Sequence, residues 1–335
     1  MNASRLYRGA VLGTLAALAL TACSSDPATE ATDDTAATVT VEDNFGPQTV
    51  TVPPQSVVAT DNSTFETLDT WGIPLAAGAV TLMPNTISYT EDESIIDLGS
   101  HREPNLEAIV AADPDLIING GRFAQFREQF QDLAPDAAIV EVAPRDGESF
   151  DAELKRGVTV LGEIFDKETE AQALSDAFDE SIARVQAAYS PDQSVMGLIV
   201  SGGQIGYVAP STGRTIGPMF DIFGMTPALD VPEGTDDHQG DDISVEAIAA
   251  SNPGLIIIMD RDAGTSTGGG PDYIPATTVI EQSQALQNVA AVQEGNIIYL
   301  PTDTYTNESI QTYTEFFNSL ADLLEKQNTQ GEANN

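Results

Sequence analysis

Short aliphatic runs alternate with amphipathic segments along most of the chain. From residue 38, TVTVEDNFGPQTVTV alternates apolar and polar positions as a β-hairpin does, with Asn-Phe-Gly-Pro at the turn. SVVATD (56–61) is a short aliphatic run, and TFETLDTWG after it has helical spacing up to Gly72. LEAIVAADP and DLIING then predict a helix that ends near Asp113-Pro114 and a buried strand. This alternation predicts an α/β lobe with a mainly parallel sheet.

The pattern changes between residues 151 and 190, where helix breakers are almost absent. Apolar residues recur there at helical spacing, which predicts one long helix, or two nearly collinear helices broken around Asp166-Lys167. The α/β pattern restarts after Pro191, and SIQTYTEFFNSLADLLEK forms a final helix. We therefore predict an N-terminal α/β lobe over residues 40–150, a connecting helix over 151–190, a C-terminal α/β lobe over 191–327 and a frayed tail over 328–335.

One sequence motif, which we call the repeated phrase, occurs twice in the chain. Residues 105–118 read NLEAIVAADPDLII, and residues 244–257 read SVEAIAASNPGLII. In each copy Glu-Ala-Ile opens a short helix, the Pro ends it and the aliphatic run enters a buried strand. Glu107 and Glu246 hold matching places, 139 residues apart (246 minus 107). The helix dipole alone favours a glutamate in a first turn, but it does not explain why the whole phrase recurs. The repeat predicts two related α/β lobes.

The start of the chain has the features of an export signal. A short basic segment precedes the apolar stretch GAVLGTLAALALTA (9–22), which is too short to span a bilayer, and Cys23 follows at once. The residues Leu-Thr-Ala-Cys resemble the bacterial lipobox, and this Cys is the only one in the chain. The resemblance implies a signal peptide over residues 1–22, and a lipidated Cys23 with a flexible tether over residues 23–39. We expect the protein to be held by its lipid anchor on the extracytoplasmic face of the cell membrane.

The charge of the chain narrows its possible partners. Only 13 Lys and Arg stand against 52 Asp and Glu, for a net charge of −39. Such a chain repels phosphate backbones, which excludes nucleic acid as a partner. Solubility or adaptation to salt accounts for the global charge. An arginine at a cleft nevertheless has few cationic neighbours here and is available to bind an anion.

Several segments resemble the helical-backbone class, or class III, of periplasmic-type binding proteins. They are GSHREPNLEAIVAADPDLIINGGR, ISVEAIAASNPGLIIIMDR, the long helical stretch and VAAVQEGNIIYLP. The resemblance covers roughly residues 40–325 and implies two Rossmann-like lobes with mainly parallel sheets, joined by one long α-helix. TFETLDTWGIP, APSTGRTIGPMFDIFGMTPA and Asp260-Arg261 are most similar to the subgroup that binds catecholate siderophores, including petrobactin-type chelates.

The resemblance also implies a function and partners. Lipoproteins of this class deliver ferric siderophores, haem or cobalamin to ABC importers, which consist of a permease dimer with its ATPase. A glutamate on each lobe pairs with permease arginines, and its place in the repeated phrase assigns this role to Glu107 and Glu246. The implied protein is a monomer and no enzyme. It has no resident cofactor, since the ferric siderophore is its transported ligand.

Candidate ligand-binding residues follow from charge and from the same resemblance. A ferric tris-catecholate is anionic and has flat aromatic rings, which favours Arg over Lys. By position, the resemblance places Arg122, Arg214 and Arg261 at the cleft; a surface charge or a carboxylate partner is the alternative for each. His238 and Tyr305 lie in loops that supply iron ligands in some members of the subgroup. The loop after His238 is one residue longer than expected, and the loop at Tyr305 lacks the usual Trp-Tyr and glycines, so a solvated His238 is the favoured alternative.

The chain lacks the sequence motifs that other functions would require. The chain has no G-x-S-x-G, HExxH or S-x-x-K arrangement, which argues against a secreted enzyme. Its two histidines are too few for a Zn or Mn carrier, and we expect the one not discussed above, His101, in a surface loop. A purely structural wall lipoprotein would have no use for the duplicated glutamates. Within the class, haem and cobalamin remain alternatives to a catecholate siderophore.

Overall fold

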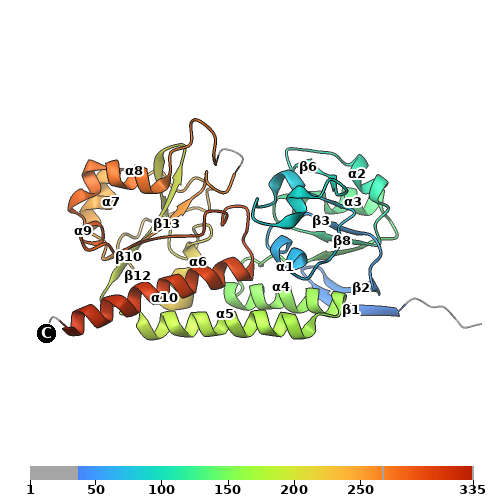
Figure 1. The fold of residues 1–335 in the computed structure, drawn as a ribbon, viewed down its shortest axis with the longest axis horizontal. Coiled ribbons are helices and arrows are strands. Elements are labelled where there is room, and N and C mark those ends of the chain that lie inside the picture. Colours follow the sequence, from blue (N-terminus) through green and yellow to red (C-terminus); the bar gives the residue numbers. More distant parts are fainter. Residues whose placement is uncertain (1–36, 266–267, 334–335) are drawn as a thin grey trace, which may run out of the picture. The chain divides into compact units, whose positions relative to one another are not determined.

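The computed structural model describes residues 37–265 and 268–333 (Figure 1). The predicted signal peptide, Cys23 and most of the predicted tether lie outside these residues. The described chain opens with an antiparallel hairpin of β1 (Ala37–Asp43) and β2 (Gly46–Val52). Residues 37–39 therefore belong to a strand and not to the tether, because they pair with the end of β2. No described helix is both long enough and apolar enough to span a membrane.

The N-terminal lobe is built on a parallel sheet of five strands in the order β5-β4-β3-β8-β9. Leu116, Ile117 and Ile118 of its strand β8 are fully buried, as the aliphatic run predicts. The strands are β3 (Val57–Ala59), β4 (Ala77–Gly78), β5 (Ile96–Asp97), β8 (Leu116–Asn119) and β9 (Ala138–Glu141). Around them lie α1 (Phe65–Thr70), η1 (Val80–Leu82), η2 (Ser88–Glu91), the hairpin β6 (Gly99–Ser100) and β7 (Glu103–Pro104), α2 (Glu107–Ala112), η3 (Gly121–Phe126) and α3 (Arg127–Leu133).

The C-terminal lobe has a mixed sheet in the order β11-β10-β13-β14, and β12 also pairs with β10. Only β11 is antiparallel to its neighbour. The strands are β10 (Ser194–Ser201), β11 (Gln204–Val208), β12 (Thr226–Pro227), β13 (Leu255–Asp260) and β14 (Ile297–Tyr299). The helices of this lobe are α6 (Gly217–Phe223), α7 (Val245–Ser251), α8 (Ala276–Gln282), η4 (Gln284–Asn288) and α9 (Ala290–Glu294).

The connection between the lobes is a pair of antiparallel helices, α4 (Phe150–Phe165) and α5 (Glu168–Ala188). The predicted break at Asp166-Lys167 is confirmed, but the prediction of collinear helices is wrong. Asp166 adopts the left-handed conformation with φ of 55° and reverses the chain. Lys155 Nζ consequently lies 2.7 Å from Asp179 Oδ1, a pairing that only a reversed α5 allows.

The last helix, α10 (Ile310–Ala333), packs along α5 beneath the lobes (Figure 1). Phe178 stacks on Phe317 with ring centroids 5.6 Å apart, and Arg184 pairs with two carboxylates of α10. The tail predicted to fray from residue 328 is helical up to Ala333, because Asn328 Nδ2 donates to Ala188 O at 2.9 Å.

Helix α4 contributes to both lobe cores. Leu154 and Val158 belong to the apolar cluster of the C-terminal lobe, together with residues of α5, α6 and α10. Val160, Leu161 and Ile164, one and two turns further on, belong to the cluster of the N-terminal lobe. One helix thus closes the core of each lobe, which ties the two together by apolar burial.

The repeated phrase adopts the same structure twice. In the first copy α2 leads into β8, and in the second α7 leads into β13. Both helices end in a left-handed residue before the proline, Asp113 with φ of 44° and Asn252 with φ of 47°. Asp and Asn tolerate this conformation better than most residues do. The prediction of two related α/β lobes is confirmed.

Candidate functional site

Two of the predicted arginines follow corresponding strands of the two lobes. Arg122 lies in η3, just after β8, and Arg261 directly follows β13. Both stand at the carboxyl ends of parallel strands, where open α/β sheets bind their ligands. They are 139 residues apart (261 minus 122), the same spacing as Glu107 and Glu246. The sequence repeat therefore extends to these arginines, a signal that the sequence analysis did not use.

All three predicted arginines converge on the predicted tyrosine. The guanidinium carbons of Arg122, Arg214 and Arg261 lie 5.1, 5.2 and 4.6 Å from the centroid of the Tyr305 ring. These distances are within the range of cation–π attraction. Tyr305 is 8% exposed, and the arginines are partly buried around it. We call these four residues the arginine cluster.

The arginines differ in their other partners. Arg214 forms two hydrogen bonds with the carboxylate of Glu308, at 3.1 and 2.7 Å. Arg261 Nη1 lies 3.0 Å from Asp262 Oδ1, so each of these two arginines has a carboxylate partner within the chain. Arg122 instead donates to Asn62 Oδ1 at 2.8 Å, and it forms no ion pair with any residue that the structure describes. Arg122 is the cation most available to an anionic ligand.

The cluster favours the ionised form of Tyr305. Burial alone raises the pKa of its phenol. A hydrogen bond and the positive charge of Arg122, together with the charges of Arg261 and Arg214, outweigh burial and lower the pKa below its ordinary value. Tyr305 is therefore more readily ionised than an isolated tyrosine.

Tyr305 lies on residues 301–309, the segment between β14 and α10, which we call the crossing loop. This loop comes from the C-terminal lobe but is hydrogen-bonded to the N-terminal lobe. Asn62 Nδ2 donates to Thr306 O at 2.7 Å, and Thr86 Oγ1 donates to Asp303 Oδ2 at 2.6 Å. Asn307 and Ser309 both donate to the carboxylate of Glu66 in α1. These bonds fix the Tyr305 ring between the lobes.

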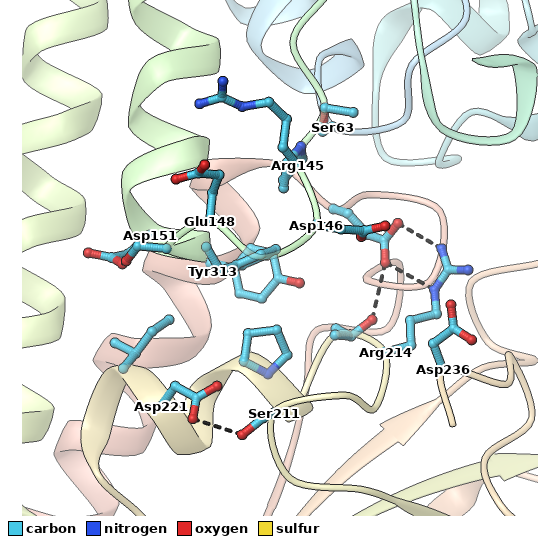
Figure 2. Close-up of a pocket in the computed structure, with 18 of the residues that line it drawn as sticks. Ser63, Arg145, Asp146, Glu148, Asp151, Ser211, Arg214, Asp221, Asp236 and Tyr313 are labelled. Atoms are coloured by element: carbon cyan, nitrogen blue, oxygen red, sulfur yellow. Dashed lines mark hydrogen bonds and ion pairs between the residues drawn. The ribbon is translucent and has the colours of Figure 1, made fainter. Parts of the chain in front are cut away.

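A cavity of about 800 Å³ lies between the lobes beside the cluster (Figure 2). Its volume is in the range of sites for small molecules. Arg122 and Arg214 belong to its wall, whereas Tyr305 and Arg261 do not line it. The N-terminal lobe contributes the ends of β3 and β8 to the remaining wall. Residues 143–151, which lead into α4, form another part of it. The rest comes from residues of α5 and α6 and from Tyr313 of α10.

Asp61, at the end of β3, is a buried carboxyl in the wall of this cavity and was missed by the sequence analysis. It is 2% exposed, and its Oδ1 accepts hydrogen bonds from Ser63 N at 3.0 Å and Ser63 Oγ at 2.9 Å. Its Oδ2 has no hydrogen-bond partner among the described residues. Gly120 leaves room for it, because a Cβ there would lie 2.5 Å from Oδ2. The only sequence signal was a polar residue after an aliphatic strand.

Burial raises the pKa of Asp61 to about 6; the hydrogen bonds of Ser63 oppose this shift, and the negative charges of Glu308 and Glu141 add to it. The folded protein thus holds this proton more tightly than the unfolded chain, whose carboxyl has a pKa near 3.8. Stability from this group is present below about pH 4 and is lost as the pH rises through about 6.

We expect Asp61→Asn to raise the free energy of unfolding at pH 7.5 by up to about 3 kcal/mol, since the amide has no charge to bury. At pH 4 the difference between variant and wild type should shrink towards zero. Urea unfolding of both proteins at several pH values between 4 and 8 would measure it. A difference that is constant over this range would contradict the burial of an ionised Asp61.

The two histidines lie apart from one another. His238 is in an exposed loop with 46% of its side chain accessible, 3.9 Å from Asp237, and it does not line the cavity. Its role as an iron ligand stays a prediction. His101 lies in the loop predicted for it, in the turn between β6 and β7, but its Nδ1 is buried and without a partner among the described residues. Burial, and then the charges of Arg122 and Arg102, lower the pKa of His101.

Glu107 and Glu246 are exposed in the first turns of α2 and α7. Neither lines the cavity or contacts the arginine cluster. Their carboxylates have no ion-pair partner in residues 37–265 and 268–333. They are therefore free to meet another protein.

Comparison with known proteins agrees with this geometry. The family model described as "Periplasmic binding protein" matches residues 57–304. The petrobactin-binding protein YclQ of Bacillus subtilis is 28% identical over 319 residues, which is 92% of this chain and 96% of YclQ. The crystal structure of YclQ aligns with a TM-score of 0.72 at 25% identity, over 86% of this chain and 99% of that one.

Two further relatives are siderophore-binding proteins. The ferric-anguibactin-binding protein FatB of Vibrio anguillarum is 29% identical over 269 residues, or 80% of this chain and 81% of FatB. The siderophore-binding protein BauB, solved with two molecules of acinetobactin and ferric iron, has a TM-score of 0.72 at 25% identity and covers 86% of this chain and 99% of its own. The predicted two-lobed fold of class III binding proteins is confirmed, and this chain belongs to the periplasmic binding protein family.

Proposed function

We propose that the protein captures a ferric siderophore, of catecholate type, in the cleft between its lobes and delivers it to an ABC importer. The observation that carries this proposal is the convergence of Arg122, Arg214 and Arg261 on one buried tyrosine. The chain has a net charge of −39, so a local concentration of arginines is best explained by the binding of an anion. The relatives named for petrobactin and ferric anguibactin support the same class of ligand.

The geometry suits a chelate that is anionic and flat. Guanidinium groups donate planar pairs of hydrogen bonds to catecholate oxygens, and they keep their charge at any physiological pH. The lowered pKa of Tyr305 allows its phenolate to complete the coordination of iron in a chelate that leaves positions open. The protein acts by binding and release, without catalysis, and iron is cargo rather than a resident cofactor.

The same proposal includes a membrane partner on each lobe. Glu107 and Glu246 dock on the two halves of a permease dimer with its ATPase, and one monomer spans both. Acyl chains on Cys23 hold the protein at the extracytoplasmic face of the cell membrane. Metabolic labelling with a fatty acid should mark the protein and not its Cys23→Ser variant; equal labelling of both would contradict the anchor.

A ligand panel tests the proposed function. We expect ferric catecholates to quench the fluorescence of Trp71 and the tyrosines at the lowest concentrations. A neutral ferric hydroxamate should bind more weakly, because it offers less charge to the arginines. Haem and cobalamin, the alternatives within the class, should not saturate the protein in the same range. Preferential binding of either would replace the catecholate in the proposal.

A further inference from the structure

Successive residues of the crossing loop bind different lobes. Asn307 Nδ2 donates to Glu66 Oε2 at 3.0 Å, and Ser309 Oγ donates to the same oxygen. Glu308, between them, accepts two hydrogen bonds from Arg214 of the C-terminal lobe. Glu66 belongs to α1 of the N-terminal lobe, which lies beside the start of α10 (Figure 1). Three consecutive residues thus join a helix of one lobe to an arginine of the other.

Glu66 is held by neutral donors. Besides Asn307 and Ser309, Thr312 Oγ1 donates to its Oε2 at 3.3 Å. The carboxylate is half-buried, and in the part of the chain that the structure describes it forms no ion pair with a Lys, Arg or His. It does not line the cavity. Three hydrogen bonds to one oxygen fix both the carboxylate and the segment that donates them.

The contact does more than close the end of α10. That helix has a cap of its own, because Ser309 Oγ accepts a hydrogen bond from Thr312 N at 3.1 Å. Its first turn contains no acidic residue. A carboxylate near the N-terminus of a helix is stabilising, and Glu66 supplies it from another element. The helix dipole therefore helps to hold α1 of the N-terminal lobe against the crossing loop.

The position of Tyr305 depends on how this loop is held. Tyr305 lies two residues before Asn307, on a segment that leaves the C-terminal lobe. Burial raises the pKa of its phenol, and a hydrogen bond and the charge of Arg122, with the charges of Arg261 and Arg214, outweigh burial. Arg122 belongs to the N-terminal lobe. The ring can therefore meet Arg122 only while the loop is bound to that lobe.

We propose that Glu66 is a positioning residue for the siderophore site: it holds the crossing loop so that the Tyr305 ring lies against Arg122. The proposal rests on the proposed function and names a residue outside the cavity that determines the affinity of the site. Glu66 acts through Asn307 and Ser309 and does not touch the ligand. Without its carboxylate the ring would move away from Arg122, and the phenol would lose the contact that favours its ionised form.

The ionisation of Tyr305 provides a test that needs no ligand. The ultraviolet absorbance of tyrosinate is followed against pH in the wild type and in Glu66→Ala, and each curve is compared with that of the same protein carrying Tyr305→Phe. The difference isolates Tyr305. Glu315→Ala is the matched control, since Glu315 is an exposed residue of α10 outside the cavity and gives the same change of net charge. Isothermal titration with a ferric catecholate gives the Kd of each protein.

We expect the pKa of Tyr305 to rise in Glu66→Ala towards the ordinary value of a tyrosine, because Arg122 no longer faces the ring. The Kd for the ferric catecholate should increase by about five- to tenfold, the effect of one weakened polar contact. The control should match the wild type in both measurements. An unchanged Tyr305 titration in folded Glu66→Ala would overturn the proposal, whatever the Kd.

Asn307→Ala provides a second variant that leaves Glu66 in place. It removes one of the three donors, so it should raise the pKa of Tyr305 in the same direction but by less. The double variant should match Glu66→Ala, because both changes act on one contact. Fully additive effects would contradict a shared contact. If Glu66→Ala does not fold, an unchanged titration in Asn307→Ala overturns the proposal.

Failure of the proposed function would look different. If the Tyr305 titration shifts as expected but neither wild type nor control binds a ferric catecholate, the proposed ligand is wrong and the hold of Glu66 on Tyr305 stands. If the catecholate binds to wild type and to Glu66→Ala with equal Kd, the ligand stands and Glu66 has no part in its affinity.

Discussion

Exchange of Glu107 and Glu246 for arginine should reduce siderophore uptake by cells to background, while the Kd of the purified protein stays unchanged. Both side chains are exposed, occupy the first turns of equivalent helices and lie outside the cavity. Under the proposed function, reversal of their charge would place like charges against arginines of the permease. Loss of one partner of a charge pair in an interface costs about 2–5 kcal/mol, and two such losses are enough to abolish docking.

Uptake of the iron-loaded siderophore by cells that express each variant measures this effect. The matched control replaces Glu168 and Glu180 by arginine, since both are exposed on α5 and give the same change of net charge. The control should transport normally. Normal uptake by the Glu107 and Glu246 double variant would show that the two glutamates do not dock the importer.

Replacement of Arg122 by alanine should weaken binding of a trianionic ferric catecholate by about ten- to a hundredfold. The estimate is the net value of one hydrogen bond to a charged group, about 1.5–3 kcal/mol. Arg122 has no carboxylate partner in the described chain, so its removal should leave folding stability almost unchanged. Arg214→Ala should weaken binding and also lower stability, because it leaves Glu308 half-buried and unpaired.

Titration with a ferric catecholate and with a neutral ferric hydroxamate distinguishes the loss of a charge interaction from general damage to the site. The loss of affinity should be larger for the catecholate, and Arg122→Lys should restore only part of it, since the ammonium cannot donate two parallel hydrogen bonds. Arg102→Ala, an exposed residue outside the cavity, is the control. A change below twofold in Arg122→Ala would remove Arg122 from the site.

Local patterns in the sequence were enough to predict much of the fold. The aliphatic runs of SVVATD and of the two repeated phrases became the buried strands β3, β8 and β13, and the repeated phrase became the same helix and strand in both lobes. The break at Asp166 was predicted as well, but the direction of the chain after it was not. That direction depends on the left-handed Asp166 and on the packing of α5 against α4 and α10, which periodicity along one segment does not contain.

The candidate site, like the fold, was predictable from the sequence only in part. The arginine cluster was predicted because arginines are rare in this chain and because the resemblance placed them at the cleft. Asp61 was not predicted, because nothing along the sequence singles it out among 52 Asp and Glu residues. What distinguishes Asp61 is its burial and its unpaired oxygen, and both depend on the packing of its carboxyl against Gly120 at the end of β8.

The crossing loop and α4 hold the two lobes together even without ligand. An opening of the cleft would break the hydrogen bonds of Asn62 and Glu66 to the loop and would split the apolar contacts of α4. We therefore expect Glu107 and Glu246 to keep nearly the same spacing with and without a bound siderophore. Empty copies would then occupy the importer as competitive inhibitors, so iron flux would depend on the loaded fraction of the protein rather than on its amount. A cell that makes this protein in excess over its siderophore would slow its own uptake.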